Sequence, residues 1–264
     1  MNRIIYVLLT MAALTSCANS YNIQGSSDMQ VLDGRMLYLK VFKNSEMKNV
    51  DSCDVVHGKF QFTGTVDSTK MATLFMDDES IMPVVIERGE ISIKIDNQQQ
   101  KVSGTPLNDK LTSFLEEYNK LQSKMEDLGH KQSQAIMDGE DEAVTNARLN
   151  EEAMKIADEE DKLVTGFIEE NFDNVLGPGV FFMLTAGNRT PMLTPWIEAL
   201  MSKATDSFKN DSYVKTYYET AKQNEAIMNG MAEPMASPQV TPQAPLPQVP
   251  TPNQLAQPAD SLKQ

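Results

Sequence analysis

The first half of the chain, up to residue 103, shows hydrophobic patterns that are typical of short strands. In residues 59–63, Phe60 and Phe62 alternate with polar neighbours, which predicts a strand with one face toward a core. His57-Gly58, directly before it, has the positive-φ chemistry of a tight hairpin. Similar runs predict further strands at residues 36–42, 50–56, 72–76, 82–87 and 91–95. The pattern therefore predicts an antiparallel β-sandwich or a strongly twisted sheet.

The period of the pattern changes after Thr105-Pro106, a pair that favours a helix start with proline in the first turn. Apolar residues then recur four and three positions apart, at Leu107, Leu111, Phe114, Tyr118, Leu121, Met125 and Leu128. A second seam, which Glu160 interrupts, contains Leu149, Ala153, Ile156, Leu163 and Phe167. The acidic, glycine-containing residues 138–141 are the expected turn. This predicts an antiparallel helical hairpin, with oligomerisation through exposed seam residues as the alternative.

Shorter helices are expected after the hairpin. Residues 171–174 and Gly177-Pro178-Gly179 should break the second helix. The very apolar residues 180–186 should enter the core, and a membrane-inserting or partner-binding patch is the alternative. Thr194-Pro195 and Asp211-Ser212 have the chemistry of helix starts. The predicted fold class is α+β: an N-terminal antiparallel β-sandwich or twisted sheet, followed by an α-helical hairpin and shorter helices.

The composition shifts from Met231 onward, where eight of the thirteen prolines fall among glutamine, alanine and valine. Such a segment forms neither a helix nor a ladder, so we expect a disordered tail that is partly polyproline II. The tail is either inert or reaches a partner or the cell wall. The expected division is residues 1–16 as a signal peptide, 17–104 as a β-rich domain, 105–229 as an α-helical region packed on it, and 230–264 as a Pro/Gln-rich tail.

The N-terminus has the parts of a secretory signal, with Arg3 before an apolar run at residues 4–14. The run is too short to cross about 30 Å of hydrocarbon as a helix. Leu14-Thr15-Ser16-Cys17 then resembles a bacterial lipobox. The resemblance implies cleavage before Cys17 and lipidation of Cys17, whose several acyl chains would hold the protein on a membrane. A chance cysteine near an ordinary cleavage site is the alternative.

The net charge of the chain limits the kinds of partner that we expect. The chain carries a formal net charge of −14 at pH 7, and its 41% hydrophobic content is enough for a core. Nucleic acid and anionic headgroups should repel so acidic a body, so we expect no nucleic-acid partner and membrane contact only through the lipid. Ala18 stands where an aspartate would retain an enterobacterial lipoprotein at the inner membrane, and no acidic cluster follows Cys17. This favours the periplasmic face of the outer membrane.

The sequence contains few candidate redox, metal-binding or catalytic residues. With Cys17 lipidated, Cys53 is the only thiol, so no intramolecular disulfide is expected. Its place in an alternating strand indicates a small hydrophobe, and a reactive redox thiol is the alternative. His57 and His130 are the only histidines and lack zinc-ligand spacing, so no metal site is expected. Because no catalytic or cofactor motif occurs either, we expect a protein that is not an enzyme and holds no cofactor.

Three stretches carry a family resemblance: residues 51–64 (DSCDVVHGKFQFTG), 85–89 (VIERG) and 102–108 (VSGTPLN). They resemble an uncharacterised domain family of Bacteroidetes lipoproteins, and the similarity extends over residues 21–229. In longer relatives this domain precedes a thioredoxin-like (AhpC/TSA-type) thiol:disulfide oxidoreductase domain. The Trp-Cys-x-x-Cys nucleophile of that domain has no counterpart in this sequence. The resemblance therefore implies the non-catalytic part of those relatives and no redox activity.

Two triplets, Asp67-Ser68-Thr69 and Asp260-Ser261-Leu262, are similar to the short O-glycosylation sequon of Bacteroidetes envelope proteins, which makes Ser68 and Ser261 candidate glycosylation sites. Taken together, the sequence predicts a lipid-anchored, non-catalytic module of the cell envelope that binds a protein, peptide or glycan partner. The alternative is an accessory protein of periplasmic thiol-disulfide exchange, with Cys53 forming a mixed disulfide with its partner.

Overall fold

The structure is a computed structural model that describes residues 19–43, 46–96, 100–188 and 190–231. The chain divides into two compact units, residues 1–224 and 225–264. The sheets and helices belong to the first unit, apart from the end of the last helix. The predicted lipidation site, Cys17, and the candidate glycosylation site Ser261 lie outside the described residues, as does most of the predicted tail.

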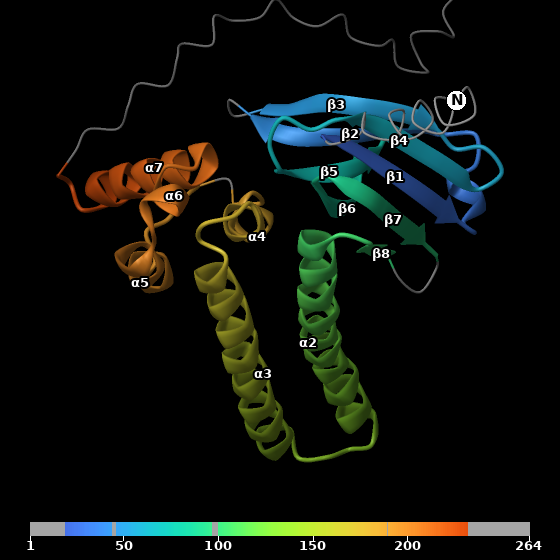
Figure 1. Cartoon of the computed structure of the whole chain (residues 1–264). Helices are drawn as coiled ribbons and strands as arrows, with labels where there is room; N and C mark the ends of the chain where they lie inside the picture. The colour runs from blue at the N-terminus through green and yellow to red at the C-terminus, as the bar shows by residue number, and fades with distance from the viewer. Residues whose placement is uncertain (1–18, 44–45, 97–99, 189, 232–264) are drawn as a thin grey trace, which may run out of the picture. The chain divides into compact units, whose positions relative to one another are not determined.

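The β-rich half forms two sheets of four strands each within the described residues (Figure 1). One sheet has the order β4-β1-β7-β8 and the other β3-β2-β5-β6. The strands are β1 (Ser20–Ser27), β2 (Met36–Lys43), β3 (Glu46–Asp54), β4 (Lys59–Thr65), β5 (Lys70–Met76), β6 (Glu79–Ile86), β7 (Gly89–Ile95) and β8 (Gln100–Ser103), with a 3₁₀ turn, η1, at Gln30–Leu32. The predicted fold class is confirmed.

The antiparallel expectation is wrong for one pair of strands. The β3-β2-β5-β6 sheet is antiparallel throughout, but β1 pairs parallel with β7 and antiparallel with β4, so the other sheet is mixed. Hydrophobic alternation has the same period in both directions, which is why it could not reveal this pairing. Neither β1 nor β8 was among the individually predicted strands, because each has few apolar residues.

The two sheets enclose the first core. Phe60 and Phe62 point into it as predicted, with 5% and 1% of their surface exposed. The hairpin turn before them is also confirmed, since His57 and Gly58 have φ angles of 52° and 70°. A Cβ atom on Gly58 would lie 2.3 Å from the backbone oxygen of Ser27, so this turn requires glycine on steric grounds as well.

The second half forms the predicted helical hairpin and shorter helices. They are α2 (Pro106–Met137), α3 (Glu142–Glu170), α4 (Leu176–Thr185), α5 (Pro195–Lys203), α6 (Asp206–Lys209) and α7 (Ser212–Met228). The predicted seam buries Leu111, Phe114, Leu121 and Leu128 of α2. At the turn, the Asp141 side chain accepts a hydrogen bond from the backbone N–H of Val144 at 3.1 Å and so caps α3. No helix in the described part of the chain is long and apolar enough to span a bilayer.

One helix boundary differs from the prediction. The second helix of the hairpin ends at Glu170, so residues 171–174 break it as predicted. Gly177-Pro178-Gly179, in contrast, belongs to the first turn of α4. Proline fits there because the first backbone N–H groups of a helix have no intrahelical partner. Gly179 allows close packing, since a Cβ atom at this position would lie 2.7 Å from the side chain of Met71 in β5. The apolar residues that follow, Val180 and Phe181, are fully buried, as expected.

The helices form a second core with the outer face of the β3-β2-β5-β6 sheet. Val85 of β6 and Met71 of β5 join this core, whereas Val84 and Ile86 join the core between the sheets. Phe181 of α4 lies at its centre, with its ring centroid 5.3 Å from that of Tyr217 in α7. The sheet is therefore covered by the other sheet on one face and by helices on the other.

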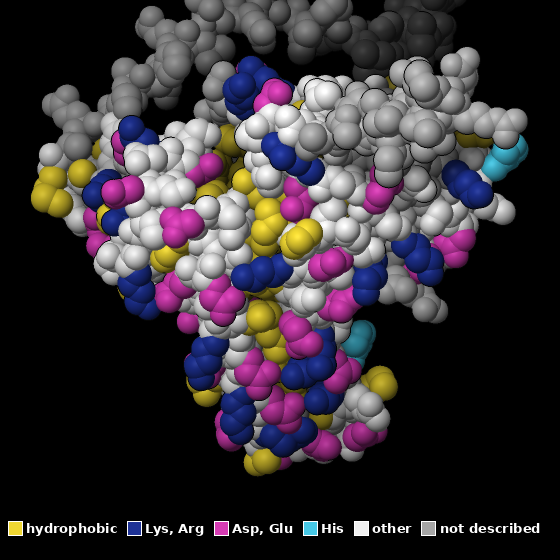
Figure 2. Space-filling view, viewed as in Figure 1, with side chains coloured by type: hydrophobic (Ala, Val, Ile, Leu, Met, Phe, Trp, Pro, Cys, Tyr) yellow, Lys and Arg dark blue, Asp and Glu magenta, His cyan; other side chains and the backbone are white. Residues whose placement is uncertain are grey.

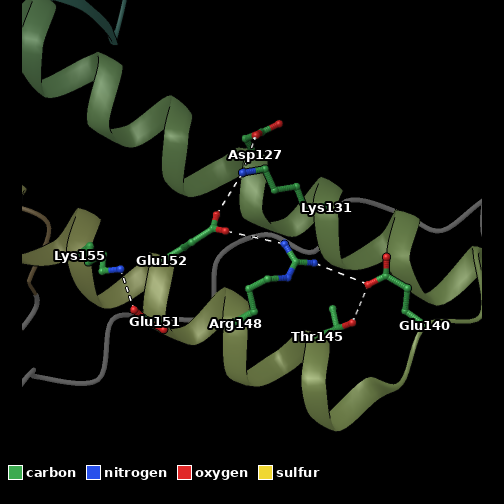
Figure 3. Close-up of polar contacts among 8 residues, drawn as sticks. All are labelled: Asp127, Lys131, Glu140, Thr145, Arg148, Glu151, Glu152 and Lys155. Atoms are coloured by element: carbon green, nitrogen blue, oxygen red, sulfur yellow. Dashed lines mark hydrogen bonds and ion pairs between the residues drawn. The ribbon is translucent and has the colours of Figure 1, made fainter.

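Polar contacts join α2, α3 and the turn between them at the far end of the hairpin (Figure 3). Glu152 accepts a hydrogen bond from Lys131 at 3.1 Å and lies 3.8 Å from Arg148. Arg148 also lies 3.6 Å from Glu140 in the turn, to which the Thr145 hydroxyl donates. The hydrogen bond to Glu152 raises the pKa of Lys131. Such exposed pairs contribute little to stability individually because water and salt screen them.

The start of α2 is attached to β6 by the side chain of Asn108, which is fully buried. Its carboxamide accepts from the backbone N–H of Val85 and donates to the Val85 carbonyl, both at 2.8 Å. It also donates to the hydroxyl of Thr105 at 2.8 Å. Glu87 caps the helix by accepting from the backbone N–H of Leu107 at 2.9 Å. Asn108 thus occupies the place that a neighbouring strand would take at the edge of the sheet.

Replacing Asn108 by alanine should lower the free energy of unfolding by about 2–4 kcal/mol, because the N–H and C=O of Val85 would stay buried without partners. The matched control is Asn119→Ala on the exposed face of the same helix, which should change it by less than about 0.5 kcal/mol. Urea unfolding followed by circular dichroism measures both values. Equal effects of the two substitutions would contradict the role given to Asn108.

Candidate binding groove

The structure places the predicted site residues apart from one another. Cys53 lies in β3, opposite Leu37 of β2. Ser68 lies in the exposed connection between β4 and β5, where a glycan would be accessible. His57 is in the hairpin turn and His130 is exposed on α2. The described residues contain no group of three or more histidine, cysteine, aspartate or glutamate side chains that could hold a metal ion.

The Cys53 thiol is half-buried and packs against the core between the sheets. Burial raises the pKa of Cys53 from 9.0 to about 11, and the negative charges of Asp51 and Asp54 act in the same direction, against a backbone hydrogen bond from Gln61. Asp51 also accepts a hydrogen bond from the Tyr21 hydroxyl at 3.0 Å. Because the thiolate is the nucleophile, this environment suppresses the reactivity of Cys53 at neutral pH.

A groove of about 900 Å³ lies on the outer face of the β3-β2-β5-β6 sheet. One side consists of the end of the β2–β3 hairpin and the start of β5. The other consists of the start of α4 and the segment that joins α6 to α7. Figure 2 shows hydrophobic side chains in a recess between the helices and the strands, with basic side chains on the strand side. We call this the sheet–helix groove.

The centre of the sheet–helix groove is aromatic. The ring centroid of Phe42 in β2 lies 5.0 Å from that of Phe182 in α4 and 5.2 Å from that of Tyr213 in α7. Tyr213 is fixed by a contact of 3.0 Å between its hydroxyl and that of Thr185, and burial raises its pKa. Met47 and Val175 add further apolar surface. A ligand in this groove would therefore meet an apolar, aromatic surface.

Four lysines line the groove on its strand side, in a chain whose net charge is −14: Lys40, Lys43, Lys48 and Lys70. The Lys40 amino group lies over the ring of Phe75, 4.5 Å from its centroid, and 4.0 Å from a carboxylate oxygen of Asp78. None of the other three forms an ion pair within 4.0 Å with any described residue.

Two aspartates also line the groove. Asp211 accepts hydrogen bonds from the backbone N–H groups of Tyr213 and Val214, at 2.9 and 3.2 Å, so its carboxylate is occupied at the start of α7. Asp173 lies in the exposed connection between α3 and α4. The three lysines without an ion pair therefore give the strand side of the groove a local positive charge.

The match to a known family covers the first part of the chain. Residues 21–111 match the family described as Domain of unknown function (DUF4369). The DUF4369 region extends from β1 to the second turn of α2 and so includes Asn108. All four groove lysines lie in it, whereas the α4 and α7 side of the groove lies beyond it. No curated protein matches the chain.

The groove has no continuous signal in the sequence. Its lysines are 3 to 30 positions apart, and its helical side comes more than 100 residues after its first strand. The available signal was the concentration of lysine in residues 40–48 of an otherwise acidic chain. Lysines at such positions are by themselves typical of a solvated strand edge, where lysine commonly prevents pairing with another strand.

The native Cys53 thiol should react slowly with a disulfide reagent such as DTNB. A pKa of about 11 in place of 9.0 lowers the thiolate fraction of Cys53 at pH 7.5 about a hundredfold. The reaction of the folded protein should therefore be at least about a hundredfold slower than that of the protein unfolded in guanidinium, and its rate should rise with pH. A Cys17→Ala chain leaves Cys53 as the sole thiol. A Ser52→Cys, Cys53→Ser variant provides an exposed thiol on the same strand as the control. Equal rates for both thiols would contradict the shielding of Cys53.

Proposed function

We propose that the protein is a lipid-anchored, non-catalytic module of the cell envelope that binds a partner in the sheet–helix groove. The observation that supports this function best is the groove itself, in which an aromatic centre lies beside lysines without an ion pair. Its volume of about 900 Å³ is in the range of ligand-binding sites.

The anchor is the second part of the proposal. The lipobox-like residues 14–17 and the resemblance to Bacteroidetes lipoproteins support lipidation of Cys17 and a place at the periplasmic face of the outer membrane. The acidic body favours attachment through the lipid alone, because anionic headgroups repel it. A tether of this kind leaves the groove free to meet soluble or membrane-bound partners.

The alternative role in thiol-disulfide exchange loses support from the surroundings of Cys53. A thiol that reacts with a partner needs exposure and a lowered pKa, and Cys53 is half-buried with a raised pKa. The binding role is therefore the function that we retain.

Lipidation is tested by replacing Cys17 with alanine in the native host. Wild type and a Cys53→Ala control should label with radioactive palmitate and partition into the detergent phase, because acyl chains hold them there. The Cys17→Ala chain should do neither. An unlabelled wild type, or a Cys17→Ala chain that stays in the detergent phase, would contradict the anchor.

Partner binding is tested by placing a photo-crosslinking amino acid at Asn49 in the groove and, as the control, at Asn119 on the exposed face of α2. Irradiation of intact cells should give a defined adduct from position 49 alone, since only that position faces the proposed partner. Mass spectrometry identifies the adduct as a protein, peptide or glycan conjugate. Identical adducts from both positions, or none from position 49, would contradict binding in the groove.

A further inference from the structure

We propose, on the basis of the binding role assigned to the groove, that its occupant is an extended acidic segment of a partner protein. The segment adds to the sheet as a strand where β2 and β5 separate, and its carboxylates meet Lys43, Lys48 and Lys70. Three observations support this occupant: the open strand edges in the groove, the arrangement of its apolar residues and its charge.

The strand edges come first. β2 and β5 are paired only from Leu37–Met76 to Lys40–Thr73, although β2 continues to Lys43 and β5 begins at Lys70. The register of β2 against β3 shifts between Leu39 and Lys40, as at a β-bulge, which bends a strand and increases its twist. Beyond this shift, three residues of each strand have no partner in the other among the described residues.

These open edges line the groove. Val41, Phe42 and Lys43 of β2 and Lys70 and Met71 of β5 all contribute to its surface. Backbone N–H and C=O groups on such edges are strong hydrogen-bonding groups, and an extended peptide satisfies them by adding a strand. A glycan offers no amide ladder that would do the same.

The apolar residues fit the alternation of an extended chain. Phe42 is paired with Met47 across the β2–β3 hairpin, so both side chains lie on the same face of the sheet. Phe182 and Tyr213 face them from the helices. Because side chains of an added strand alternate between its two faces, every second residue of the segment would meet this apolar surface. The remaining residues would point away from it.

The charge of the groove determines which residues of the segment fit at the remaining positions. The lysines without an ion pair lie at three different points of the strand side, on β2, β3 and β5. Lys43 and Lys70 lie on the open parts of β2 and β5, and Lys48 lies one strand further away, paired with Val41 across the β2–β3 hairpin. Acidic side chains at alternate positions of the segment would each approach a lysine, whereas a basic segment would be repelled. The recognised sequence is thus acidic and apolar residues in alternation.

The test measures binding of a fluorescein-labelled decapeptide with alternating glutamate and valine to the full mature chain carrying Cys17→Ala. Fluorescence anisotropy should show saturable binding. The triple variant Lys43→Gln, Lys48→Gln, Lys70→Gln should bind at least tenfold more weakly. A control triple variant of exposed hairpin lysines, Lys120→Gln, Lys155→Gln, Lys162→Gln, should stay within twofold. Circular dichroism spectra establish that each variant is folded.

Three further probes separate strand addition from simple charge attraction. A decapeptide with N-methyl groups on alternate amides, which blocks the ladder, should bind at least fivefold more weakly, and one with lysine in place of glutamate should not bind. An oligogalacturonate of similar charge represents a glycan. Equal binding of the methylated peptide, or lysine-dependent binding of the glycan without binding of the acidic peptide, would overturn the inference.

The outcome is distinguishable from failure of the proposed function. If no acidic peptide binds but position 49 still crosslinks to a partner in cells, the groove is a binding site and its occupant is not an acidic strand. If position 49 gives no adduct either, the binding function fails together with the inference.

Discussion

Burial of the β3-β2-β5-β6 sheet on both faces is the constraint on which the rest of the structure depends. Within β6, Val84 and Ile86 face the other sheet while Val85 faces the helices, and each is at most 2% exposed. Helices that cover a sheet edge also remove its backbone groups from water, so those groups need partners. Asn108 supplies them to Val85, and Gly179 lets α4 approach β5 closely. The attachment of the helical region therefore combines an apolar face with the buried hydrogen bonds of Asn108.

The groove follows from the limits of this coverage. α2 meets the sheet at β6, and α4 meets it at β5 and at Phe42 of β2. β2 nevertheless continues to Lys43, beyond the last of its residues that pairs with β5. No strand lies between the separated ends among the described residues, and the helices approach from one side only. A concave surface with open strand edges results from the unequal extent of the paired strands. No additional structural element is needed to form the groove. Its lysines lie on β2, β3 and β5, which are strands of the sheet itself.

Local patterns in the sequence predicted the parts of the fold that depend on neighbouring residues. The alternation around Phe60 and Phe62, the turn at Gly58 and the helical seam through Leu121 all have short-range signals. The parallel pairing of β1 with β7 joins residues about 70 positions apart, and nothing in either strand encodes its direction. The groove was equally hidden, because it exists only where Phe42, Phe182 and Tyr213 are brought together by the two-sided covering of the sheet. The sequence contains the residues of the groove, but only the fold brings them together.

The net charge of the chain sharpens the selectivity of such a groove. An acidic body repels an acidic segment over most of its surface, so an approaching peptide gains little from contacts outside the lysine-lined side. At physiological ionic strength this repulsion is screened beyond about 8 Å, while contacts within the groove lie inside that distance. The general repulsion then acts mainly against non-specific binding, and the few lysines without an ion pair determine where an acidic chain can be held. A uniformly basic surface would bind acidic segments more widely and with less selectivity.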